Sequence, residues 1–141
     1  MKATFKRYCK VLELRDDPQL IAEYKRLHAG GGAWPEIGQG IREVGIIDME
    51  IYIRGTTLFM IMDTATDFDH DKAMAKLGKL PRQAEWEALM SKFQKTSRDA
   101  SAAEKWQLVE RIFKLGEKHP EKAKDGYLEE VNVRRSPTAI P

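Results

Sequence analysis

Ile46-Ile-Asp-Met-Glu-Ile-Tyr-Ile-Arg-Gly-Thr-Thr-Leu-Phe-Met-Ile-Met-Asp63 is a run in which apolar and polar side chains alternate. A period of two residues through 46–54 is typical of a half-buried strand. The two expected faces of this strand hold Ile47, Met49, Ile51 and Ile53 on one side and Ile46, Asp48, Glu50 and Tyr52 on the other. Gly55 and the two threonines after it are typical of a hairpin turn, so residues 58–63 are expected to form the return strand.

One strand and two helical segments are predicted before this hairpin. Residues 3–14 alternate and contain neither Gly nor Pro, which indicates a strand. The acids at 16–17 precede a proline, as at a helix start, and apolar residues then follow at helical spacing until the glycines at 30–32. Pro35 opens a second helical piece, which Gly45 closes.

Helical patterns at 69–77 and 83–93 follow the hairpin, and residues 127–133 read as a final strand. Ser101-Ala-Ala-Glu104 has the spacing of a capping box, so we expect a further amphipathic helix over about 101–118. Residues 96–124 would then be an inserted helical segment. The order β-α-β-β-α-β, with this additional helix, predicts an α+β, ferredoxin-like subunit.

Length and composition narrow the class of protein. A chain of 141 residues, 42% hydrophobic and 33% charged, fits a single globular domain over 1–141. The net charge of +2 is spread along the chain, which argues against nucleic-acid binding. No apolar run approaches the roughly 20 residues of a membrane span. The lone Cys9 excludes an internal disulfide framework, and we expect a cytoplasmic protein.

Helices on one side of a four-stranded sheet would leave apolar side chains bare on the other face. A second subunit is the simplest cover for such a face, so the sequence predicts a homodimer.

The most informative candidate site is Tyr24-Lys-Arg-Leu-His28. Positions four apart share a helix face, so the phenol and the imidazole point the same way. Imidazole titrates near neutrality, which suits proton transfer in a pocket. The alternative is that both side chains simply cover the edge of the core.

Other candidates are less specific. Trp34 and Glu36 could stack on a sugar and bind its hydroxyls, but a loop anchor and a helix first-turn acid explain them equally well. Trp86 has the spacing of a core residue, and Asp48 faces either the helices or a pocket. The scattered histidines make no metal motif, and no nucleotide-binding or serine-hydrolase motif is present.

In this order, the motifs resemble the L-rhamnose mutarotase family: a first strand, Tyr24-x-x-x-His28, Trp34-Pro35-Glu36, Ile51-Tyr52 before a hairpin, and Trp86 in a late helix. The resemblance implies a dimeric α+β barrel that interconverts the α and β anomers of L-rhamnose without cofactor or metal. It also implies that His28 is the proton donor and that Tyr24 and Trp86 bind the sugar. Asp48 is our further candidate for sugar binding.

Two departures from the family pattern make L-fucose, or another deoxyhexose, an alternative substrate. Glu87 stands where the family has a second aromatic residue, and Met49 where it has a sugar-contacting tyrosine. Ring opening needs a proton on the ring oxygen and an acceptor for the anomeric proton, for which Asp48, Glu50 or a water is the candidate. A haem- or quinone-type monooxygenase of the same fold and a non-catalytic metabolite-binding dimer are the competing functions.

Overall fold

The computed structural model describes residues 2–31, 34–96, 100–116 and 125–132. The elements in chain order are β1 (Lys2–Glu13), α1 (Pro18–His28), the 3₁₀ turn η1 (Ala29–Gly31), α2 (Pro35–Glu43), β2 (Ile46–Arg54), β3 (Thr57–Thr64), α3 (His70–Leu77), α4 (Gln83–Met90), α5 (Ala102–Lys105), β4 (Gln107–Leu108) and β5 (Tyr127–Asn132).

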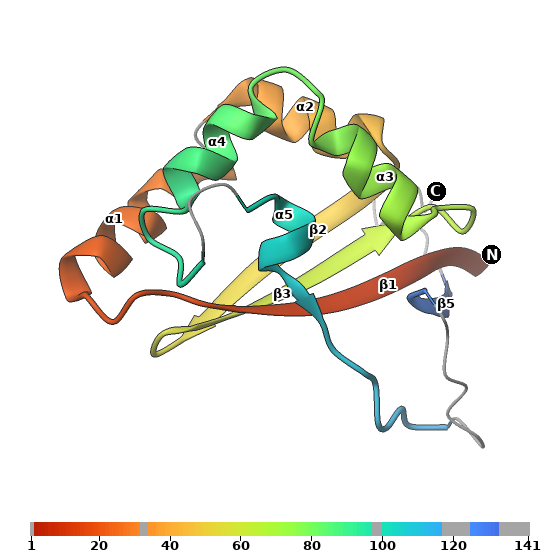
Figure 1. Ribbon diagram of the computed structural model, residues 1–141. Helices are drawn as coiled ribbons and strands as arrows, with labels where there is room; N and C mark the ends of the chain where they lie inside the picture. Colours follow the sequence, from red (N-terminus) through yellow and green to blue (C-terminus); the bar gives the residue numbers. More distant parts are fainter. Residues whose placement is uncertain (1, 32–33, 97–99, 117–124, 133–141) are drawn as a thin grey trace, which may run out of the picture.

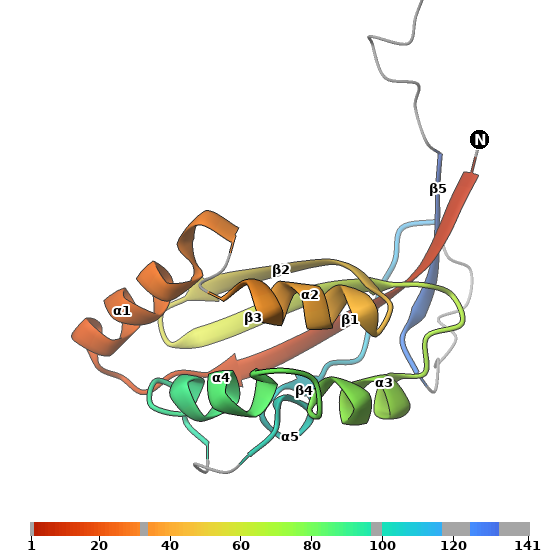
Figure 2. The same cartoon turned by 90° about the horizontal axis from the view of Figure 1, so that it is seen from above.

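The sheet is antiparallel and has the strand order β2-β3-β1-β4, with β5 also pairing with β1. Figure 1 shows α1, α2, α3 and α4 above one face of this sheet, and Figure 2 shows the same arrangement from above. The order and the one-sided helices confirm the predicted α+β, ferredoxin-like subunit.

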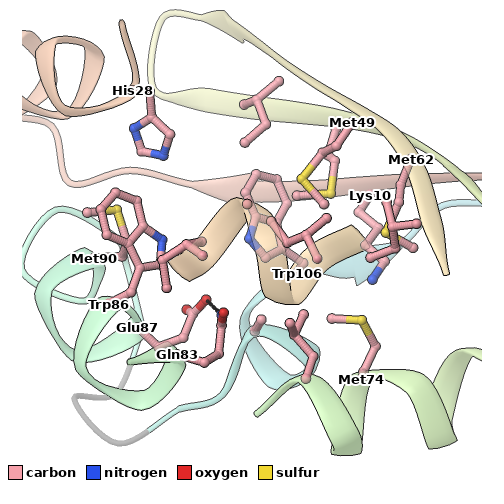
Figure 3. A pocket seen from close by; sticks show the side chains of 18 of the residues that line it. Lys10, His28, Met49, Met62, Met74, Gln83, Trp86, Glu87, Met90 and Trp106 are labelled. Carbon is pink, nitrogen blue, oxygen red and sulfur yellow. Dashed lines mark hydrogen bonds between the residues drawn. The ribbon is translucent and has the colours of Figure 1, made fainter. Parts of the chain in front are cut away.

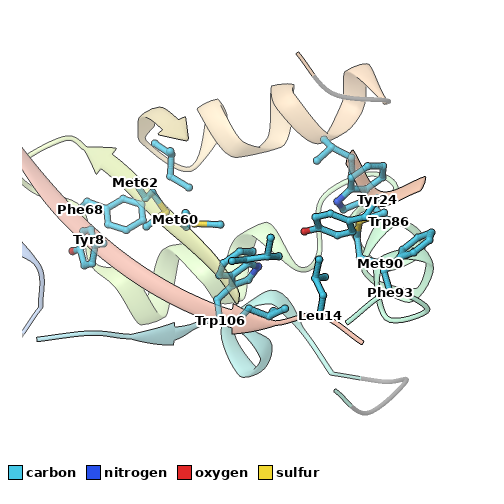
Figure 4. Close-up of a cluster of buried hydrophobic side chains, with 14 residues drawn as sticks. Tyr8, Leu14, Tyr24, Met60, Met62, Phe68, Trp86, Met90, Phe93 and Trp106 are labelled. Atoms are coloured by element: carbon cyan, nitrogen blue, oxygen red, sulfur yellow. The ribbon is translucent and has the colours of Figure 1, made fainter. Parts of the chain in front are cut away.

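Strand alternation separates an inner sheet face, which meets the helices, from an outer one. In β1 and β3 the inner side chains are buried and come from alternate positions, namely Tyr8, Lys10, Leu12, Leu58, Met60, Met62 and Thr64. Aromatic side chains from the helices and loops complete the core, including Trp86, Phe93 and Trp106 in Figure 4. Burying an apolar side chain of this size contributes roughly 1.5–3 kcal/mol.

The predicted faces of β2 are wrong at its first residues. Ile46 is 2% exposed and Ile47 is 63% exposed, the reverse of the regular alternation. The cause is a register shift between Ile46 and Asp48 opposite β3, where a β-bulge adds one unpaired residue. From Met49 onward the expected faces are correct.

The helix that begins at the Ser101 capping box is present but shorter than predicted. It ends at Lys105, and the next residues pair with the free edge of β1, where Val109 N–H donates to the Cys9 carbonyl at 2.9 Å. Ile112 and Phe113, which fall within the helix predicted over about 101–118, lie beyond the end of α5 and are largely exposed. Pairing with the unpaired N–H and C=O groups on the edge of β1 is thus favoured over the helix that the spacing of apolar residues predicts. Residues 117–124 of the predicted segment lie outside the described residues.

The predicted helix over 83–93 also ends early, at Met90. No helix in the described ranges is long and apolar enough to cross a bilayer.

Gly126 gives a stability prediction. Its φ is +71°, and a Cβ there would lie 2.7 Å from Cζ of the buried Tyr8 ring. Gly126→Ala is therefore expected to lower the free energy of unfolding by about 2–4 kcal/mol, through left-handed backbone strain and overpacking.

The matched control is Gly55→Ala, because Gly55 has φ +62° and nothing within 4 Å of the added Cβ. Gly55→Ala should lower the free energy of unfolding by only about 1–2 kcal/mol, the cost of left-handed backbone at a residue with a Cβ. Urea denaturation of both variants measures the difference, and equal losses would contradict the packing of Tyr8 on this glycine.

Candidate functional site

A cavity of about 420 Å³ lies between the helices and the inner face of the sheet. Its volume is in the usual range for small-molecule sites. Apolar and aromatic side chains form most of its wall. The polar or titratable side chains on that wall are Lys10, Tyr24, His28, Arg42, Asp48, Gln83, Glu87 and Gln94.

Helix α1 places Tyr24 and His28 together on this wall. The Asp17 carboxylate caps the helix by accepting from the N–H groups of Gln19 and Leu20, so the helix starts at a defined position. The two rings lie 4.3 Å apart between centroids. Both residues line the cavity, as the spacing of four predicted.

One hydrogen bond fixes the role of each imidazole nitrogen. His28 Nδ1 lies 2.8 Å from the Tyr24 carbonyl oxygen, which can only accept, so Nδ1 carries a hydrogen. Nε2 is then the nitrogen that gains and loses a proton. Figure 3 shows the ring at the cavity, above Trp86. His28 therefore lines the cavity with an Nε2 that the Tyr24 carbonyl does not engage.

Trp86 and Trp34 form an aromatic corner beside this histidine. The Trp86 ring lies edge-on to His28 at 5.5 Å and to Trp34 at 5.1 Å. The Arg82 guanidinium stacks 4.0 Å over Trp34 and also reaches Glu36 at 3.6 Å. The buried Trp86 is thus both a core residue and part of the cavity wall, which suits packing against the CH groups of a sugar.

The Tyr24 hydroxyl is a buried hydrogen-bonding group at the cavity. Gln94 Nε2 donates to it at 3.4 Å, while Gln94 Oε1 has no partner among the described residues. Burial raises the pKa of Tyr24 to about 12, so the phenol stays protonated at neutral pH. The phenol hydrogen and the Gln94 oxygen are thus available to a bound ligand.

Glu87 accounts for one departure seen in the sequence. Its carboxylate pairs with Lys105 Nζ at 2.8 Å and accepts from Gln83 Nε2 at 2.9 Å. The Lys105 side chain is fully buried, and its ammonium also donates to the Glu87 carbonyl at 2.6 Å. This buried ion pair fastens α5 to α4 and forms part of the cavity wall in place of a second aromatic ring.

Glu50 does not line the cavity, and Asp48 lines it from an exposed position. Glu50 accepts from the Tyr52 hydroxyl at 2.7 Å on the outer face, and Asp48 helps to raise the pKa of that tyrosine. Asp48 borders the cavity only at the bulge in β2, where it is exposed. The structure therefore brings Tyr24, His28 and Trp86 together and leaves Asp48 at the rim.

Lys10 is a cavity residue that the sequence reasoning did not single out. Its side chain is 1% exposed, and within the described ranges its ammonium has no hydrogen-bond or ion-pair partner. Burial lowers the pKa of Lys10 to about 8, while Asp125 and Asp71 act more weakly in the opposite direction. The sequence indicates this placement in part, because the alternation of β1 puts Lys10 on the same face as the apolar side chains of Tyr8 and Leu12.

Of the remaining histidines, His70 lies away from this group. His70 is the first residue of α3 and packs on Tyr8 at 5.3 Å between ring centroids, and His119 is outside the described residues. Among the residues with described structure, no cluster of three His, Cys, Asp or Glu could hold a metal ion.

Comparison with known proteins gives matches over most of the chain. The family model described as L-rhamnose mutarotase matches residues 7–115. The "L-fucose mutarotase" of Xanthomonas campestris pv. campestris is 40% identical over 114 residues, or 81% of this chain and 91% of that protein. A UPF0734 protein of Dictyostelium discoideum is 34% identical over 115 residues, or 79% of this chain and 90% of that protein.

The fold also matches a solved structure. The crystal structure of an L-rhamnose mutarotase from Formosa agariphila superposes with a TM-score of 0.58 at 18% identity, covering 78% of this chain and 98% of that one.

The buried ammonium of Lys10 gives a prediction for stability. A lysine whose pKa falls from 10.5 to about 8 on folding destabilises the native state at pH 7, by up to about 3 kcal/mol. Lys10→Met is therefore expected to raise the free energy of unfolding at neutral pH by an amount of that order.

The sign of the pH dependence follows from proton binding. Between pH 8 and 10.5 the unfolded chain binds more protons at Lys10 than the native protein, so the Lys10 contribution to stability rises with pH. The difference in free energy of unfolding between Lys10→Met and wild-type protein should hence decrease over pH 8–10, as measured by denaturant titration. An advantage that is constant with pH would show that Lys10 has an ordinary pKa.

Proposed function

The chain belongs to the L-rhamnose mutarotase family, and on that premise we propose that it interconverts the α and β anomers of L-fucose. It is a sugar mutarotase, and hence an isomerase, which replaces the monooxygenase and non-catalytic alternatives. The observation that favours L-fucose is the 40% identity with a protein named L-fucose mutarotase. L-Rhamnose is the second candidate because the family model carries its name.

His28 acts as the acid in the proposed mechanism. The imidazolium Nε2–H gives its proton to the ring oxygen while the anomeric hydroxyl loses one, and the bond between C1 and the ring oxygen breaks. The open-chain aldehyde forms, and its carbonyl turns about the C1–C2 bond. The hydroxyl at C5 then attacks the other face of C1 and returns its proton to His28, while the acceptor gives a proton back to the oxygen on C1.

The acceptor of the anomeric proton is a water in this proposal. Of the three acceptors considered from the sequence, Glu50 is bonded to Tyr52 on the outer face and Asp48 is exposed at the rim. Neither carboxylate is placed beside His28. Sugar rings open slowly even without a catalyst. One positioned acid and one water are therefore enough groups to catalyse ring opening in this proposal.

Tyr24 and Trp86 hold the sugar in this proposal. The Tyr24 phenol donates to a sugar oxygen, and the Trp86 ring covers an apolar CH face. The edge-on contact between Trp86 and His28 keeps that face next to the proton donor.

A second copy of the chain is proposed to cover the outer face of the sheet. Tyr52 is 55% exposed and Phe59 is 36% exposed, and they are direct cross-strand partners on β2 and β3. The two rings form an apolar area on a face that carries no helix. With a single cysteine in the sequence, we also propose a cytoplasmic location.

The proposed function is tested by NMR saturation transfer between anomeric protons. The wild-type protein should accelerate exchange of L-fucose more than that of L-rhamnose. His28→Gln should lower the enzyme-catalysed rate about 10²- to 10⁴-fold, because general acid catalysis is lost.

Lys25→Gln is the matched control, an exposed position on the same helix, and it should keep the wild-type rate. Wild-type protein that accelerates exchange of neither sugar would refute the proposed substrates. A folded His28→Gln variant with the wild-type rate would refute the role of His28 alone.

The proposed homodimer gives its own prediction. Phe59→Glu places a charge on the outer face and should convert a dimer into a monomer, as measured by analytical ultracentrifugation. The control Lys76→Glu, on an exposed position of α3, should remain dimeric. A wild-type protein that sediments as a monomer at high concentration would contradict the proposal.

A further inference from the structure

We propose that Lys10 binds the 4-hydroxyl group of the sugar and thereby selects L-fucose over L-rhamnose. The inference rests on the proposed function and assigns to a residue of this chain the specificity of the same site.

The first observation is the missing partner of the Lys10 ammonium. The side chain leaves the inner face of β1 next to Met60 and reaches the cavity with only 1% of its surface exposed. No donor or acceptor in the described part of the chain bonds to it, although a buried ammonium has three N–H donors to satisfy. A ligand with hydroxyl oxygens in the cavity supplies the missing acceptors.

The second observation is the position of Lys10 relative to His28. Figure 3 shows the imidazole and the ammonium at opposite ends of the cavity, with Trp106 and Met49 between them. If His28 serves the ring oxygen, the anomeric end of the sugar lies near it. The hydroxyls on the far side of the ring are then the ones directed toward Lys10.

The third observation is the apolar surroundings of the ammonium. Met49, Met62 and Met74 line this end of the cavity with thioether and methylene groups. Across the pyranose ring from C1 lies C4, which carries a hydroxyl and a CH group. The Lys10 ammonium can donate to this hydroxyl, and the methionine side chains around it can pack on the neighbouring CH groups.

The stereochemistry of the two sugars makes this contact selective. L-Fucose and L-rhamnose differ in configuration at C2 and C4, so their 4-hydroxyls leave the ring in different directions. Lys10 is the cation among the methionines at this end of the cavity, and in this proposal its position matches the direction of the 4-hydroxyl of L-fucose. The other sugar leaves the buried ammonium and its own hydroxyl unpaired, which is the strongest basis for rejection.

The test compares wild-type protein, Lys10→Met and Lys10→Gln on three sugars: L-fucose, L-rhamnose and 4-deoxy-L-fucose. Wild-type protein should act on L-fucose with a kcat/KM about 10- to 100-fold above that for 4-deoxy-L-fucose, the range of a hydrogen bond to a charged group. Lys10→Met should lose the same factor for L-fucose, mainly in KM, and should treat the two sugars alike. Its preference for L-fucose over L-rhamnose should disappear.

Lys10→Gln keeps one N–H donor without the charge and should retain an intermediate preference. Lys76→Met is the matched control, an exposed lysine that should behave as wild-type protein. Thermal melting checks folding, and Lys10→Met is expected to be at least as stable as wild-type protein.

Three outcomes would overturn the inference while the proposed function stands. In the first, Lys10→Met keeps the wild-type ratio between the two natural sugars. In the second, the losses from the variant and from removing the 4-hydroxyl multiply, so that the two groups act independently. In the third, kcat alone falls and selectivity is unchanged, which would assign Lys10 to proton transfer. Inactivity of wild-type protein on both natural sugars would instead refute the proposed function.

Discussion

The pairing of β1 with β3 is the constraint on which the site depends. Their register runs from Lys6 opposite Thr64 to Glu13 opposite Thr57. Since successive side chains point to opposite faces, this register sends Lys10 to the helix-covered side and Arg7, with its partner Asp63, to the other. A slip of one residue would exchange the two faces and remove the buried lysine from the cavity.

The cavity has a mostly apolar wall with a few polar groups. These polar groups differ in protonation and in their hydrogen-bond and ion-pair partners. His28 has one nitrogen engaged and one available, while Tyr24 is held as a protonated phenol by burial. Glu87 and Lys105 satisfy each other, which removes both from direct chemistry. Lys10 is a buried cation at the cavity with no ion-pair partner among the described residues, whereas Arg42 and Asp48 line the cavity from exposed positions. In the proposed mechanism, proton transfer takes place at the His28 end of the cavity and Lys10 contributes recognition at the other end.

The sequence predicted those parts of the fold and site that depend on local spacing. Tyr24 and His28 share a helix face, and the hairpin at 46–63 forms as expected. The bulge at Ile46 and the early end of α5 were not predictable, because both depend on pairing with a strand distant in sequence. Alternation puts Lys10 on the same face of β1 as Tyr8 and Leu12, but it does not show whether a lysine on that face meets packed core or a cavity. The same holds for Gln94, whose unpaired oxygen becomes informative only beside Tyr24.

The most direct measurement is a crystal structure of the protein soaked with L-fucose at neutral pH. We expect His28 Nε2 to lie about 2.6–3.2 Å from the ring oxygen of the sugar, with the Trp86 ring against its CH face. A sugar bound with its anomeric carbon away from His28, or bound outside the cavity altogether, would contradict the account.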